Sequence, residues 1–77
     1  MNIRKFLGFK PRVGDQIAAG MDFGVHFKGT VIEDNSSNEA LPHYICKGVT
    51  TIYTHWNGVV EKESDREIVP AGRARIA

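Results

Sequence analysis

A single dipeptide constrains the fold of this chain more than any other feature. Asn57-Gly58 follows the run Val49–Trp56, which is rich in β-branched and aromatic residues, and it precedes Val59-Val60. Asn-Gly adopts the positive φ angles that a tight hairpin turn requires, and the flanking residue types favour strands. The sequence therefore predicts a β-hairpin with its turn at Asn57-Gly58. Two roles are open for Trp56 beside this turn, namely a hydrophobic anchor against Val59 and an exposed contact residue.

The rest of the chain divides into short segments that alternate between apolar and polar residues. Val13–Ala19 and Val25–Val31 both alternate in this way, and His43–Lys47 is followed by a break at Gly48. Such alternation is typical of strands, and Gly29 stands where a bulge or a sharp bend is expected. The predicted core consists of Val13, Ile17, Val25, Phe27, Val31, Tyr44 or Ile45, Ile52 and Ile68.

The order of these segments resembles the SH3-like small barrels over roughly residues 12–76. The resemblance is carried by Val13-Gly14-Asp15-Gln16-Ile17, then Lys28-Gly29-Thr30-Val31-Ile32, and finally the turn Ile68-Val69-Pro70-Ala71 before a short last strand. It implies a mostly-β fold, an SH3-like barrel of about five strongly bent strands. It carries no function with it, because this scaffold serves many unrelated ones.

The length of the chain limits its organisation. Its 77 residues suffice for one small domain and leave no room for a second. Residues 1–12 are predicted to form a basic amphipathic arm, as a short helix or an extended segment, and residues 13–77 a single small β-barrel domain. A chain this short buries only about 60–65% of its unfolded surface, and so thin a core often needs self-association or a partner.

Cysteine usage points to a compartment. Cys46 is the only cysteine, so the chain can form no intrachain disulfide. A secreted domain of this size would usually carry several cysteines, and we therefore expect a cytoplasmic protein.

Charge is distributed unevenly along the chain. Residues 1–12 carry four basic side chains and no acidic one, and residues 70–77 carry two basic side chains and no acidic one. The intervening residues 13–69 carry four basic and nine acidic side chains. The near-neutral total of +1 thus conceals two basic ends around an acidic body, and basic ends of this kind either bind polyanions or fold back onto the acids.

No arrangement of residues selects an enzyme or a cofactor. His43, Cys46 and His55 are the one set that offers zinc-type ligands, but His43 and Cys46 face opposite sides of a continuous strand. We therefore predict no catalytic, cofactor-binding or metal-binding residues and no cofactor. A small enzyme whose active site lies between identical subunits remains an alternative, because such a pocket needs no large chain.

A non-catalytic binding module is the preferred interpretation. It would self-associate or dock on a larger protein partner, and its size fits an accessory protein of a mobile element or phage. Small barrels present loops and aromatic surfaces to partners. The predicted partner-binding residues are Phe6, Phe9, Tyr53, His55 and Trp56.

Nucleic-acid binding is the main alternative partner class. Small barrels bind single strands by stacking bases on aromatic residues while basic residues contact phosphates. The residues that would do so here, beside the aromatic hairpin, are Arg4, Lys5, Lys10, Arg12, Arg73 and Arg75. A membrane is the least supported partner, because residues 2–9 offer too short an amphipathic face.

Overall fold

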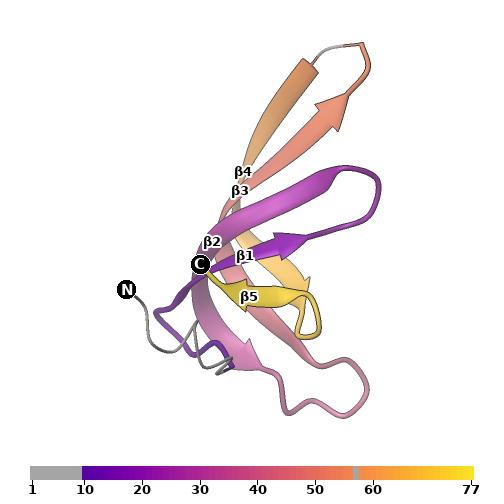
Figure 1. The fold of residues 1–77 in the computed structure, drawn as a ribbon. Coiled ribbons are helices and arrows are strands. Elements are labelled where there is room, and N and C mark those ends of the chain that lie inside the picture. The colour runs from indigo at the N-terminus through magenta and orange to yellow at the C-terminus, as the bar shows by residue number, and fades with distance from the viewer. Residues whose placement is uncertain (1–9, 57) are drawn as a thin grey trace.

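The computed structural model describes residues 10–56 and 58–77, and these form five strands (Figure 1). The strands are β1 (Gln16–Gly20), β2 (Val25–Asn35), β3 (His43–Thr54), β4 (Gly58–Pro70) and β5 (Ala74–Ile76). They make one antiparallel sheet in the order β4-β3-β2-β1-β5. The described part of the chain contains no helix, and the mostly-β prediction is confirmed.

A pair of glycines marks a close approach of two strands in the sheet. Gly29 on β2 lies directly opposite Gly48 on β3. A Cβ atom on Gly48 would lie 2.1 Å from the carbonyl oxygen of Lys28, and one on Gly29 would lie 2.4 Å from that of Lys47. The missing side chains let the backbones of β2 and β3 approach each other closely. The sequence predicted a break at Gly48, whereas β3 continues through it.

Curvature of the sheet encloses one apolar core, to which every strand contributes. Its largest fully buried side chains are those of Tyr44 and Phe27, and Cys46 is completely inaccessible. The core residues are Ile17, Ala19, Phe27, Val31, Tyr44, Cys46, Val69 and Ala74.

The predicted core is correct for part of its members. Ile17, Phe27, Val31, Tyr44 and Ile45 are buried, whereas Val25 and Ile52 are only half-buried. The sequence did not identify the small residues Ala19 and Ala74, or Val69 and Ile76, as core residues.

Two members of the predicted core are wrong. Val13 is exposed because it lies in a turn, which the Asp15 carboxylate closes by accepting from the backbone N–H of Arg12 at 2.8 Å. Ile68 is exposed because the pleat turns it away from its buried neighbour Val69.

The predicted hairpin is present with a different register. β3 and β4 pair along their whole length, but Thr54 pairs with Gly58 and Tyr53 with Val59. The connection therefore spans residues 55–57, and Gly58 supplies a positive φ of 70°. Trp56 lies in the connecting loop and is almost fully exposed, so the alternative in which it anchors against Val59 does not hold.

Closure of the sheet differs from the prediction. The sheet is open, with β4 at one edge and β5 at the other, so a closed barrel is not confirmed. The predicted arm, residues 1–12, lies mostly outside the described residues, and the part that is described, residues 10–12, is not helical. The division into an arm and a domain of residues 13–77 stays a prediction.

Candidate interaction surfaces

Five large apolar side chains are exposed near the ends of two adjacent hairpins. We call them the hairpin surface: Phe23, Tyr53, Trp56, Val59 and Val60. Phe23 is 98% exposed and Trp56 is 93% exposed, so neither contributes to the core. The β3–β4 hairpin that carries four of the five extends beyond the rest of the sheet (Figure 1). Tyr53 and Val59 are paired across β3 and β4 and lie on the same face, whereas Val60 points to the opposite face. Exposed apolar side chains gathered at one end of a sheet are typical of contact surfaces.

The backbone holds Phe23 in this exposed position. Phe23 has a φ of 60°, in the left-handed region that side chains with a Cβ rarely occupy. The following residue, Gly24, accepts a hydrogen bond from the N–H of Tyr53 at 3.3 Å, which ties the β1–β2 loop to β3. A strained backbone that presents an aromatic ring to solvent is a feature of functional loops.

The face of the sheet opposite the core, called the outer face below, contains a depression. Its volume is about 690 Å³, and its floor includes the small residues Ala18 and Gly20. Lys28 and Arg75 lie on one side of it and Glu61 on the other, so its two sides carry opposite charge. His26 and Tyr53 form an aromatic wall, with ring centroids 5.7 Å apart in an edge-to-face arrangement.

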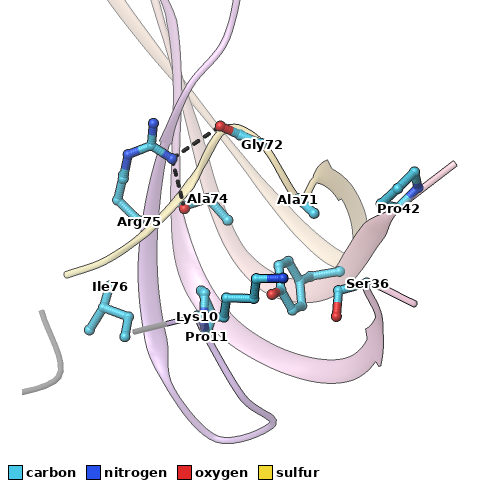
Figure 2. Close-up of a pocket in the computed structure, with 10 residues that line it drawn as sticks. Lys10, Pro11, Ser36, Pro42, Ala71, Gly72, Ala74, Arg75 and Ile76 are labelled. Atoms are coloured by element: carbon cyan, nitrogen blue, oxygen red, sulfur yellow. Dashed lines mark hydrogen bonds between the residues drawn. The ribbon is translucent and has the colours of Figure 1, made fainter. Parts of the chain in front are cut away.

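The basic C-terminal residues are engaged with the chain itself. Arg73 pairs with the carboxylate of Asp22 at 3.1 Å and donates to the carbonyl of Gly20 at 3.3 Å. Arg75 donates to the carbonyls of Gly72 and Ala74, at 3.0 and 3.1 Å, as Figure 2 shows. The Arg73–Asp22 pair is of the kind expected if the basic ends fold back onto the acids, whereas Arg75 contacts only backbone carbonyls of its own segment.

The remaining predicted contact residues divide between described and undescribed parts of the chain. Tyr53, His55 and Trp56 are exposed and lie close together along the hairpin. Lys10 and Arg12 are exposed on the segment that precedes β1, and Arg4, Lys5, Phe6 and Phe9 lie outside the described residues. The roles assigned to all these residues stay predictions.

A second cavity, of about 760 Å³, lies at the end of the core beside the β4–β5 turn (Figure 2). Tyr44, Ala74 and Ile76 give it an apolar wall, and Ser36 and Lys10 stand at its polar side.

The zinc-type residues are not brought together. His43 begins β3 and its Nδ1 lies 2.6 Å from the carbonyl oxygen of Leu41, whereas His55 follows the opposite end of that strand. Within residues 10–56 and 58–77, no three histidine, cysteine or acidic side chains form a metal-binding cluster. Burial raises the pKa of Cys46 to about 11, with a smaller contribution from the charge of Glu67, so its thiol is protonated and non-nucleophilic at neutral pH.

The exposed edge of the sheet at β4 is strongly charged. Six of the seven residues from 61 to 67 are charged, and Arg66 forms an ion pair with Glu33 on β2. Charged side chains on an edge strand discourage pairing with strands of other molecules. The short run Gly58–Val60 next to it is free of charge and belongs to the apolar hairpin end.

Two residues of the hairpin surface, Val59 and Val60, were not predicted from the sequence as contact residues. Tyr53 and Trp56 were predicted as contact residues, but Val59 and Val60 were seen only as the start of a strand. The sequence does contain a signal for them. Successive side chains of a strand point to opposite faces, and next to a turn neither face is covered by much of the sheet, so two consecutive valines there indicate exposed apolar side chains.

No helix within the described residues has the length and apolar character needed to cross a membrane. Comparison of the chain with protein-family models, with curated proteins and with solved structures gave no match.

Proposed function

We propose that this chain is a non-catalytic binding module that docks on a protein partner, or on a further copy, through the hairpin surface. The observation that carries the proposal is the exposure of Phe23, Tyr53, Trp56, Val59 and Val60 around one end of the sheet. Aromatic side chains, tryptophan and tyrosine above all, supply much of the binding energy at protein interfaces.

A protein partner is favoured over a nucleic acid by the charges around these residues. Glu61 stands in the outer-face depression, and Glu63 follows it on the same strand face. Both would repel phosphates that approached Lys28 or Arg75. Arg73, one of the predicted phosphate contacts, is already paired with Asp22.

The fold of the module is proposed to be a partly open SH3-like barrel. The strand order supports this, because β5 pairs with β1 at one edge while β4 ends the meander at the other. The tight bend at Gly29 and Gly48 supplies the curvature that such a barrel needs. We propose a cytoplasmic location for the protein on the strength of its single, buried and unpaired cysteine.

Trp56 provides the test, because it is the only tryptophan and lies on the proposed surface. Its emission is expected to be that of a solvated indole in the free protein and to move to shorter wavelength when a complex forms. The mass of the complex is followed by size-exclusion chromatography with light scattering, both for the protein alone and with proteins captured by a tagged chain.

Matched variants test whether a complex forms through the hairpin surface. The double variant Trp56→Ser, Val59→Ser is expected to lose the complex while its circular dichroism stays that of the folded protein. Leu41→Ser, which removes an exposed apolar side chain from the loop before β3, is expected to keep the complex. A complex that forms equally well with the double variant would contradict the proposal.

A further inference from the structure

We propose that the outer face of the sheet is a two-fold self-association surface, which pairs this chain with a second copy of itself. The inference goes beyond the hairpin surface, because it is argued from Lys28, Val49 and Glu63 and their neighbours and specifies the partner, although Tyr53 of the hairpin surface borders this face. It is carried by the register of β2, β3 and β4, which places two similar rows of side chains across this face.

The two rows carry similar types of side chain in the same order across the three strands. In the first, Lys28 on β2 is opposite Val49 on β3, and Val49 is opposite Glu63 on β4. In the second row, His26, Thr51 and Glu61 occupy the corresponding places. Each row thus begins with a basic side chain, passes through a partly buried β-branched residue, and ends with a carboxylate.

The ends of one row cannot neutralise each other within a chain. Lys28 and Glu63 are separated by one intervening strand, which places their backbones about 10 Å apart. Arg66–Glu33 and Arg73–Asp22 are ion pairs between described residues, and neither includes Lys28, Glu61 or Glu63. The charges of Lys28, Glu61 and Glu63 are therefore available for contact with another molecule.

The pattern is complementary to itself under one symmetry operation. A two-fold axis that runs along β3, between two sheets packed face to face, lays β4 of one copy over β2 of the other. Glu63 of each copy then faces Lys28 of the other, and Glu61 faces His26. Val49 and Thr51 lie along the axis and meet their own counterparts. An axis across the strands would instead oppose glutamates to glutamates.

The shape of the face is compatible with such a contact. Val49 and Thr51, which lie along the axis, line the depression of about 690 Å³, whereas its small residues Ala18 and Gly20 belong to β1, outside the overlap of β2, β3 and β4. Sheets that pack face to face lie about 10 Å apart and bury rows of β-branched side chains between them.

A charge-exchange experiment tests the contact. The association of the full chain, of Lys28→Glu, of Glu63→Lys and of an equimolar mixture of the two variants is measured by sedimentation equilibrium. Each single variant opposes like charges twice in its homodimer, and we expect its Kd to rise at least about tenfold. The mixture opposes only unlike charges, so a heterodimer is expected to form as tightly as the original dimer.

Controls separate this contact from others. Glu39→Lys makes the same charge change as Glu63→Lys in the exposed loop before β3 and is expected to leave the dimer intact. Trp56→Ser should also leave the dimer intact. Loss of binding through the hairpin surface can therefore be distinguished from loss of the dimer formed through the outer face. The double variant Lys28→Glu, Glu63→Lys in one chain should dimerise again, and circular dichroism checks that every variant is folded.

Three results would overturn the proposal. The first is a chain that stays monomeric at all concentrations. The second is a dimer that neither single variant weakens, or whose loss the mixture does not restore. The third is a monomer that binds labelled oligonucleotides and loses this binding in Lys28→Glu, which would assign the face to nucleic acid.

Discussion

Gly29 and Gly48 face each other across β2 and β3 at a separation that no side chain can enter. On one side of this pair β3 carries the buried residues Tyr44, Ile45 and Cys46, and on the other it carries Tyr53, which is exposed. The core continues past the glycine pair, because Phe27 lies opposite Thr50 on the hairpin side of it and both are buried, and the exposed contact residues of β3 begin farther along, at Tyr53.

The glycine pair leads to the first prediction. Gly48→Ala places a methyl group 2.1 Å from the carbonyl oxygen of Lys28, and because this neighbour is backbone, the strands must separate. We expect the free energy of unfolding to fall by at least about 2 kcal/mol, measured by urea denaturation. The matched control is Gly72→Ala, whose new methyl group meets no atom within 4 Å. A change within about 0.5 kcal/mol is expected there, and equal effects at the two sites would contradict the close approach.

Two variants separate the effect of backbone strain at Phe23 on stability from the contribution of its side chain to binding. Phe23→Gly should relieve the left-handed conformation and raise the free energy of unfolding by up to about 1 kcal/mol, because the exposed ring gives up no packing. Phe23→Ala removes the ring but keeps the strain, so stability should stay within about 0.5 kcal/mol of the original. Both variants should weaken any complex formed through the hairpin surface. A destabilised Phe23→Gly protein would show that the ring packs in solution.

The buried thiol of Cys46 predicts a dependence of stability on pH. Burial raises its pKa in the folded protein from the ordinary 9.0 to about 11, so between these values the unfolded chain loses a proton that the folded chain keeps. The free energy of unfolding should therefore be unaffected by this group below about pH 9 and should fall as the pH rises toward 11. Other groups titrate in the same range, so the original chain is compared with Cys46→Ala by denaturation at each pH. Parallel curves would show that the thiol makes no such contribution.

Charge on the β4 edge is predicted to keep the protein from aggregating. Replacing Lys62 by Val and Asp65 by Thr leaves a long, more apolar edge, and thioflavin-positive aggregates should form faster on incubation. Glu39→Val, which adds an apolar residue in a loop, serves as the control. If the control aggregates as fast as the edge variant, hydrophobicity alone explains the result and the edge has no special role.

The strands of this fold could be predicted from the sequence because their signals are local. Alternation around Phe27, the β-branched and aromatic run before Asn57, and glycine at position 29 each act over a few residues. The mostly-β class and the hairpin follow from them.

Pairing across strands could not be predicted in the same way. The residue opposite Val59 depends on the length of the hairpin loop, and because the loop spans residues 55–57, Val59 pairs with Tyr53 and not with Trp56. The rows that include Lys28 and His26 also depend on how β2, β3 and β4 pair, so no local sequence pattern predicts them. The exposure of Ile68 likewise depends on which face of β4 meets the core.

The end of the β3–β4 hairpin has a consequence for how this protein can change over generations. Its exposed residues beyond Thr50 contribute almost nothing to the core, so most replacements there should leave the domain folded. The core-forming part of the sheet does not have this freedom. Descendants of this sequence should therefore diverge first at the hairpin end and acquire new partners while the glycine pair and the core around Tyr44 are retained.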